Sequence, residues 1–193
     1  KVWTSGLDEG IRQMTNSLSL LKRKKIDLMQ IHNLVDWKTH LKTLRTWKDQ
    51  GKIRYIGVTH YIESAYPALE EVIRNHPLDF LQINYSILSR KAEERLFPLA
   101  QEKKVGVIIN QPFEEGTLFR MVKGRELPSW AEEFDCHSWG QFFLKFILSH
   151  EAITCVIPGT SKPQHMIDNA GAGFGKLPSS AHRTRMIQLI DSL

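Results

Sequence analysis

Short apolar runs alternate with amphipathic stretches along almost the whole chain. Each apolar run is five to seven residues long, is rich in Ile, Val, Leu, Phe or Tyr, and is bounded by polar or turn-forming residues, which is typical of strands buried on both faces. The runs that predict strands are 26–32, 53–59, 80–85, 105–110 and 153–157.

Between these runs the apolar residues recur at the helical period of about 3.6. In 8–23, for example, they fall at Ile11, Met14, Leu18 and Leu21. The other predicted helices are 41–50, 62–74, 91–103, 138–149, 163–170 and 179–193, while 113–135 reads as an irregular insert.

Local signals at the helix ends give further expectations. Asp8 or Ser5 is placed to cap the first helix, and Gly51 is placed to end the second.

Strictly alternating strands and helices predict a parallel sheet covered by helices, either closed into a barrel or open and doubly wound. An open dinucleotide-binding sheet carries G-x-G-x-x-G after its first strand, and the nearest glycine cluster, at 171–175, follows a helix instead. We therefore predict an α/β fold of the parallel (β/α)8 TIM-barrel type in a single domain, 1–193. Five complete strands, with 1–3 as the tail of a sixth, amount to about six of the eight βα units.

Composition narrows the set of partners. Hydrophobic residues make up 41% and charged residues 24% of the 193, and no apolar run approaches the ~20 residues that span a bilayer. The net charge is +5, but the only basic run, 22–25, follows a helix and lacks interleaved aromatic residues. We expect no membrane or nucleic-acid partner.

Cys136 and Cys155 form no CxxC pair, so we expect buried or half-buried thiols and no metal site.

Polar residues lie at or just after the carboxyl end of each predicted strand, where a parallel barrel builds its site. They are His32 and Asn33, Thr59 and His60, Gln82 and Asn84, Asn110 and Gln111, and the run 159–162. A polar residue at the end of one strand does not indicate a site, because every strand emerges into solvent at its end. Their recurrence predicts a binding site at this face.

Four motifs among these strand ends resemble those of the aldo-keto reductases. They are DLMQIH at 27–32, GKIRYIGVT at 51–59, LQINYS at 81–86 and IPGTSKP at 157–163. The resemblance is collinear over the whole chain and suggests a bacterial-type member. It implies an eight-stranded barrel that binds NADP(H), with NAD(H) as the alternative, and reduces aldehydes or ketones to alcohols.

The resemblance also implies catalytic roles for two residues. His32 matches the family histidine, whose neutral imidazole donates to the substrate oxygen, and Lys1 matches the family lysine, which lowers the pKa of a tyrosine. The family places that tyrosine and an aspartate upstream of the lysine, and neither has a counterpart in 1–193. We therefore expect the isolated chain 1–193 to lack reductase activity.

Cofactor and substrate contacts carry over in the same way. The resemblance implies that Thr59, His60 and Gln82 hold the nicotinamide carboxamide, and that Asn110 replaces a stacking tyrosine. The remaining expected cofactor residues are Gln111, Pro112 and Gly116 for the pyrophosphate, Gly159, Thr160, Ser161, Lys162 and His165 for the phosphates, and Asp168 and Asn169 for the adenine. The expected substrate pocket is Trp3, Asn33, Leu34 and Trp37.

Two further readings stand beside the reductase. The first is a cofactor-binding regulatory protein on the same fold, similar to the β subunits of potassium channels, and the second is an inactive fragment. Turnover of generic aldehydes separates the first from an enzyme. For the reductase we expect a small carbonyl substrate, a cytoplasmic location, and a monomer or weak homo-oligomer.

Overall fold

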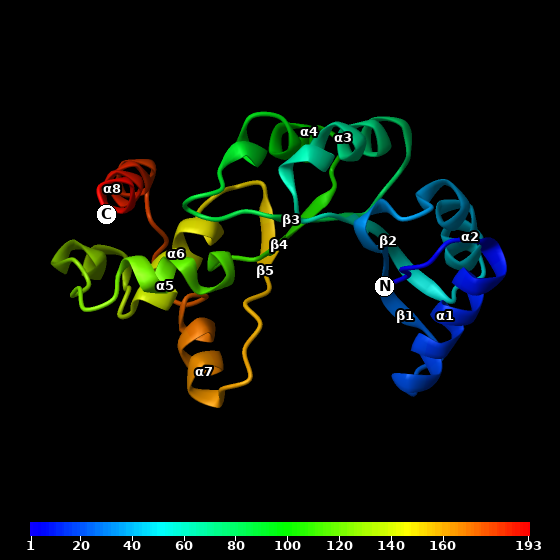
Figure 1. Ribbon diagram of the computed structural model, residues 1–193, viewed down its shortest axis with the longest axis horizontal. Helices are drawn as coiled ribbons and strands as arrows, with labels where there is room; N and C mark the ends of the chain where they lie inside the picture. Colours follow the sequence, from blue (N-terminus) through cyan, green and yellow to red (C-terminus); the bar gives the residue numbers. More distant parts are fainter. The chain divides into compact units, whose positions relative to one another are not determined.

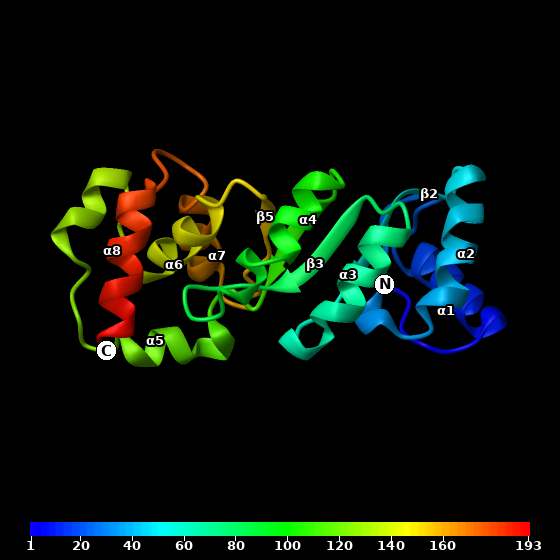
Figure 2. The same cartoon turned by 90° about the horizontal axis from the view of Figure 1, so that it is seen from above.

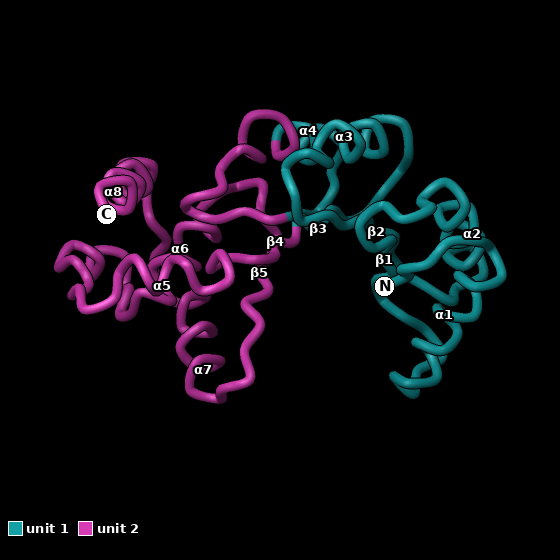
Figure 3. The backbone as a smooth tube through the Cα atoms, in the orientation of Figure 1, with its two compact units in different colours: residues 1–83, 98–107 teal, residues 84–97, 108–193 magenta.

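The computed structural model describes all residues, 1–193, and the chain falls into two compact units (Figure 3). Unit 1 comprises residues 1–83 and 98–107, and unit 2 comprises residues 84–97 and 108–193. The single-domain organisation expected from the sequence stays a prediction, and the two units are described one at a time below.

Five strands follow one another in the order β1-β2-β3-β4-β5. Their bounds are β1 Ile26–Ile31, β2 Ile53–Thr59, β3 Phe80–Asn84, β4 Gly106–Asn110 and β5 Ile153–Val156. Pairing is parallel, with Ile31 opposite Val58 and Thr59 opposite Gln82. All five predicted strands are confirmed within one residue at each end.

The first residues of the chain pair with β1, as the sequence predicts. Val2 bridges Ile31 in parallel, its N–H donates to the carbonyl of Gln30 at 2.9 Å, and its carbonyl accepts the N–H of His32 at 2.9 Å. Lys1 and Trp3 therefore flank a strand position beside His32.

Each predicted helix is present, with shifted ends. The α-helices are α1 Leu7–Leu20, α2 Trp37–Asp49, α3 Tyr66–Asn75, α4 Leu96–Glu102, α5 Thr117–Met121, α6 Trp139–Leu148, α7 Pro163–Gly171 and α8 Ser180–Asp191. The 3-10 helices are η1 His32–Leu34, η2 Glu63–Ala65, η3 Lys91–Glu93, η4 Glu114–Gly116 and η5 Ser129–Phe134. The insert 113–135 is thus more regular than expected, because it holds η4, α5 and η5.

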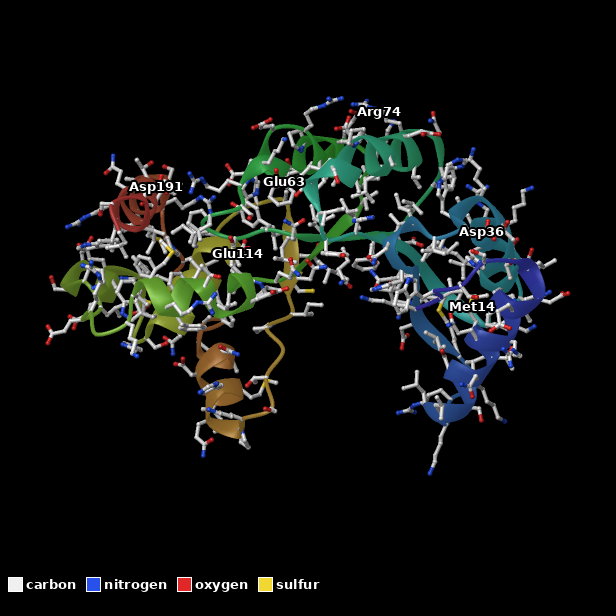
Figure 4. All side chains as sticks on the ribbon, viewed as in Figure 1. Met14, Asp36, Glu63, Arg74, Glu114 and Asp191 are labelled. Atoms are coloured by element: carbon white, nitrogen blue, oxygen red, sulfur yellow. The ribbon has the colours of Figure 1, made fainter.

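The start of α1 differs from the sequence expectation. Its N-cap is Gly6, with φ of 89°, and neither Asp8 nor Ser5 caps the helix. The carboxylate of Asp36 instead accepts the N–H of Gly6 at 2.8 Å, and Figure 4 labels Asp36 at the start of α2. A residue 30 positions away therefore takes over the capping role.

Within unit 1, α1 and α2 lie side by side (Figure 1) and meet at a glycine. An ideal Cβ on Gly10 would lie 2.4 Å from Cε1 of His40, so only glycine fits there. His40 is fully buried, and its Nε2 donates to the carbonyl of Thr4 at 2.6 Å. Its Nδ1 is buried without a hydrogen-bond partner, and the ring separates the two helices.

Within unit 2, α6 is the central helix, and Figure 2 shows α7 beside it. Its buried face is largely aromatic, with Phe142, Phe143 and Phe146 all inaccessible to solvent. The same helix buries the ammonium of Lys145, which donates to the carbonyls of Phe174 at 2.6 Å and Lys176 at 2.8 Å. This lysine fixes the segment between α7 and α8 to the core.

Three expectations from composition can be compared with the structure. Cys136 is buried and Cys155 is half-buried, and both are free thiols, as predicted. The basic run 22–25 is exposed. None of the helices combines the length and the apolar character needed to cross a membrane.

Candidate functional site

The strand-end cluster of unit 1 consists of Lys1, Trp3, His32, Thr59 and His60. His32 directly follows β1 and is half-buried, and the edge of the Trp3 indole packs against its ring at a centroid distance of 5.3 Å. Trp3 is 62% exposed, so much of the side chain that packs on His32 faces solvent.

The backbone of Trp3 is fixed by α1. The side-chain oxygen of Gln13 accepts the N–H of Trp3 at 2.5 Å, and its Nε2 donates to the Trp3 carbonyl at 3.4 Å. One amide side chain therefore holds both backbone groups of the residue that packs on His32.

Thr59, at the end of β2, contacts Nδ1 of His32. The buried hydroxyl of Thr59 accepts the N–H of Asn33 at 3.1 Å and lies 3.4 Å from Nδ1 of His32. A hydroxyl has one proton and two lone pairs, so after accepting the Asn33 N–H it can still donate to an unprotonated Nδ1. The contact is therefore compatible with the tautomer in which Nε2 of His32 carries the hydrogen.

The imidazole of His32 is held in its neutral form. Burial is the main cause that lowers the pKa of His32, followed by the positive charge of the Lys1 side chain and by His60. Partial burial also lowers the pKa of the Lys1 ammonium. A neutral ring with its proton on Nε2 can donate a hydrogen bond to a carbonyl oxygen near neutral pH.

His60 has a fixed tautomer. Its Nδ1 accepts the N–H groups of Tyr61 at 3.0 Å and Ile62 at 3.4 Å, and its ring stacks on that of Tyr61. Its proton consequently lies on Nε2, and burial lowers the pKa of the ring. His60 can donate from Nε2, whereas an asparagine amide could both donate and accept.

Left-handed backbone conformations gather next to the expected site residues in both units. In unit 1 Asn33, Leu34 and Asp36 have φ values of 52°, 55° and 43°, and in unit 2 Gln111 and Glu115 have φ values of 50° and 51°. Each costs a non-glycine residue about 1 kcal/mol, and such strain concentrates at functional sites.

The remaining expected residues of unit 1 lie apart from the cluster or beneath it. Gln82 is buried in β3, and its carbonyl accepts the N–H of His60 at 3.0 Å. Leu34 is half-buried in η1. Trp37 packs its ring on His76 at 5.1 Å rather than on His32.

Unit 2 contains a cavity of about 630 Å³, hereafter the unit 2 cavity. Its lining includes most of the cofactor residues expected in this unit, namely Gln111, Pro112, Gly116, Gly159, Thr160, His165, Asp168 and Asn169. The other lining residues are Phe113, Glu115, Phe119, Ser138, Trp139, Gly140 and Ile157. Asn110, Ser161 and Lys162 are not in the lining.

The N-terminus of α7 borders the unit 2 cavity. Pro163 occupies the first turn, Lys162 is the N-cap, and the N–H of Lys162 donates to the hydroxyl of Thr160 at 3.1 Å. No side chain caps the helix, so its first N–H groups are available to an anion.

Asp168 of α7 is hydrogen-bonded to α6. The hydroxyl of Ser138 donates to Oδ2 of Asp168 at 2.7 Å, and Nε2 of Gln141 donates to Oδ1 at 2.9 Å. Both carboxylate oxygens therefore have partners inside unit 2.

Sequence reasoning missed the aromatic lining of the unit 2 cavity. Phe113 and Phe119 belong to the insert, where no period signals a buried side, and they contact each other at a centroid distance of 4.9 Å. Ser138 had a signal, because a serine three residues before a glutamine is typical of a helix start. No group of three His, Cys, Asp or Glu side chains is close enough to hold a metal ion.

Five parallel strands with helices between them, and polar residues at their carboxyl ends, define the class of α/β proteins whose sites lie at strand ends. The chain belongs to the aldo/keto reductase family, whose model matches residues 5–188.

Two curated relatives are similar over parts of their length. An uncharacterised oxidoreductase of Schizosaccharomyces pombe is 26% identical over 171 residues, which cover 87% of this chain and 54% of the relative. The aldo-keto reductase YhdN of Bacillus subtilis is 29% identical over 102 residues, which cover 51% of this chain and 30% of the relative. The chain therefore spans about half or less of the length of these relatives.

Solved structures confirm the predicted barrel-type fold. The holo form of aldo-keto reductase AKR11C1 from Bacillus halodurans superposes with a TM-score of 0.78 at 23% identity, covering 97% of this chain and 68% of that one. An aldo-keto reductase from Klebsiella pneumoniae in complex with NADPH gives 0.76 at 18% identity, with coverages of 97% and 66%. Another from the same organism, in complex with NADP and acetate, gives 0.75 at 18% identity, with coverages of 93% and 64%.

Proposed function

We propose that the protein to which residues 1–193 belong reduces aldehydes or ketones to alcohols, with NADPH as the reductant. The observation that carries the proposal is the pair His32 and Thr59. The Thr59 hydroxyl can donate to Nδ1 of a neutral His32, which would leave the ring proton on Nε2, beside a lysine and at the end of a strand. That arrangement suits recognition of a carbonyl oxygen.

Carbonyl reduction adds a hydride to carbon and a proton to oxygen. Bound NADPH supplies the hydride. In unit 1 the Nε2–H of His32 donates to the carbonyl oxygen and orients it, and the indole of Trp3 borders the substrate. The proton comes from the family tyrosine, which residues 1–193 do not include, and Lys1 lowers the pKa of that tyrosine by its charge.

Each unit, taken by itself, holds residues that would suit one part of the cofactor. In unit 1 Thr59, His60 and Gln82 would hold the nicotinamide carboxamide, with His60 as a donor. In unit 2 the cavity of about 630 Å³ is within the range of ligand pockets and combines aromatic walls with an uncapped helix N-terminus. Thr160, Ser161 and Lys162 offer hydroxyls and a cation to a 2′-phosphate, which favours NADPH over NADH.

The test is NADPH consumption by the complete protein with generic aldehydes, followed by absorbance. We expect aldehyde-dependent consumption, and His32→Leu should lower turnover about 10²- to 10⁴-fold while leaving NADPH affinity within twofold. The isolated chain 1–193 should show no aldehyde-dependent consumption of NADPH. Absence of aldehyde-dependent consumption by the complete protein, with NADPH still bound, would instead favour a regulatory role.

A further inference from the structure

The loop 111–116, which includes η4, joins β4 to α5 and forms one wall of the unit 2 cavity. Five of its six residues line that cavity, namely Gln111, Pro112, Phe113, Glu115 and Gly116. Glu114, labelled in Figure 4, is the one that does not. Its side chain makes its contact elsewhere in unit 2.

The backbone of this loop has a conformation that residues with side chains seldom adopt. Gln111, Glu114 and Glu115 have φ values of 50°, 50° and 51°. Two hydrogen bonds lie within the loop, from the N–H of Glu114 to the Gln111 carbonyl at 3.1 Å and from the N–H of Gly116 to the Phe113 carbonyl at 2.9 Å. Left-handed conformations cost free energy and persist only where the surroundings fix them, so the loop depends on contacts from outside it.

Ser86, two residues after the end of β3, provides such a contact. Its hydroxyl donates to Oε1 of Glu114 at 2.5 Å, and Ser86 is fully buried. The same hydroxyl accepts the N–H groups of Leu88 and Ser89, each at 3.0 Å. Because a hydroxyl has one proton and two lone pairs, both lone pairs are occupied and the single proton is directed at the Glu114 carboxylate.

The turn that carries Ser86 is closed without help from Glu114. The N–H of Ser86 donates to the carbonyl of Ser89 at 3.2 Å, in addition to the two bonds that the hydroxyl accepts. The hydroxyl is therefore a fixed donor. A hydrogen bond to a carboxylate is stronger than one between neutral groups, so this contact can hold the loop 111–116 against its backbone strain.

We propose that Glu114 is a positioning residue that, through Ser86, holds the loop 111–116 in the conformation that lines the unit 2 cavity. The part that concerns the nucleotide rests on the proposed function. Its consequence is that two neighbouring carboxylates have opposite effects on nucleotide affinity. The charge of Glu115, which lines the cavity, opposes a phosphate. The carboxylate of Glu114 favours binding, because its bond to Ser86 keeps the cavity wall in place.

The experiment measures the dissociation constant of NADPH for the complete protein and its variants. We expect Glu114→Ala to bind NADPH about 5- to 20-fold more weakly, although the substitution removes a negative charge. Glu114→Gln keeps an oxygen that can accept the Ser86 proton, and it should bind within about threefold of the wild type. Glu115→Gln is the matched control and should bind more tightly. Wild-type or tighter binding by Glu114→Ala would overturn the proposal.

Ser86→Ala tests the same contact from its other side. With the donor removed, loss of the Glu114 carboxylate should have little further effect, so the double variant should bind NADPH about as weakly as Ser86→Ala alone. Losses that multiply in the double variant would overturn the role of the contact. Should Ser86→Ala fail to fold, Glu114→Ala and Glu114→Gln still decide the question.

Hydrogen exchange without nucleotide separates this inference from the proposed function. The N–H of Gly116 reports the state of the loop, because it is bonded to the Phe113 carbonyl. We expect it to exchange about tenfold faster in Glu114→Ala and at the wild-type rate in Glu114→Gln. Unchanged exchange in Glu114→Ala would overturn the positioning role even if NADPH affinity falls. Failure of the wild type to bind NADPH would contradict the proposed function, while the exchange rates would still decide the role of Glu114.

Discussion

The hydroxyl of Thr59 lies 3.4 Å from Nδ1 of His32 and simultaneously accepts the N–H of Asn33 at 3.1 Å. The register of β1 and β2 brings these residues together, because Ile31 lies opposite Val58 and each is followed by one of the two partners. The buried Thr59 hydroxyl thus contacts both the backbone of the turn after β1 and the ring of His32, which begins that turn.

Thr59→Val should remove the hydroxyl that can donate to Nδ1 of His32, since valine has the same shape but no hydroxyl. We expect the population of His32 with the proton on Nε2 to fall, as measured by ¹⁵N chemical shifts of the ring. A hydrogen bond of this kind contributes about 1 kcal/mol, so turnover by the complete protein should fall about fivefold to tenfold.

Thr59→Ser is the matched control, because serine keeps the hydroxyl and should retain the wild-type tautomer. An unchanged ¹⁵N pattern in Thr59→Val would contradict the role of Thr59.

Acid should destabilise the fold through three histidines. Burial is the largest cause that lowers the pKa values of His32, His60 and His150 below the ordinary value of 6.5. Above that value both folded and unfolded chains are neutral at these positions, and the stabilising contribution is complete. As pH falls below it the unfolded chain binds protons first, so the free energy of unfolding should decrease toward the lower folded pKa values.

Urea unfolding between pH 8 and pH 5, at about one-unit steps, checks this expectation. His60→Asn removes one of the three groups and should reduce the loss on acidification. An equal or larger loss in the variant would show that His60 does not contribute.

The strands were predictable because strands buried on both faces are continuous apolar runs. The helix starts were not. The second helix was expected from residue 41 but begins at Trp37, after Asp36 adopts a left-handed φ of 43°. The cap of α1 depends on the same Asp36, whose carboxylate reaches Gly6 from 30 residues away. No local pattern reports such a contact.

The sequence predicted where the candidate site lies in the fold, but not which hydrogen bonds its residues make. Parallel strands place His32, Thr59 and His60 at one end of the sheet whatever their roles. Which atom of Thr59 faces His32, and which helix holds Asp168, depends on register and on helix packing. The composition and period of the sequence do not contain that information. The roles carried over from the family remain predictions.

Removal of a negative charge from the unit 2 cavity should strengthen nucleotide binding. Glu115 lines the cavity together with Gly116 and Thr160, and a single weak donor, the Gln111 amide at 3.4 Å, faces its carboxylate. Because like charges repel, Glu115→Gln should lower the dissociation constant of NADPH about threefold to tenfold at low salt, and by less at high salt.

The matched control is Glu132→Gln, an exposed carboxylate in η5 that does not line the cavity. Weaker binding by Glu115→Gln would mean that the carboxylate contacts the ligand favourably.

The buried ammonium of Lys145 should be important for stability. Lys145→Met keeps the length of the side chain but removes the donor of the Phe174 and Lys176 carbonyls. We expect a loss of about 1–3 kcal/mol in the free energy of unfolding, measured with urea. Lys123→Met, at an exposed lysine, should change it by less than about 0.5 kcal/mol. Equal effects at the two positions would rule out a special role for Lys145.

The contact between Gly10 and His40 restricts how this part of the chain can change over evolutionary time. Alanine inside a helix is ordinarily favoured over glycine by about 1 kcal/mol, yet here its methyl group would overlap the imidazole. A smaller residue at position 40 would make room but would remove the donor of the Thr4 carbonyl. A change at either position alone should lower the stability of the fold, so the two residues are expected to covary among descendants of this sequence. Libraries designed to stabilise the protein should therefore vary the two positions together.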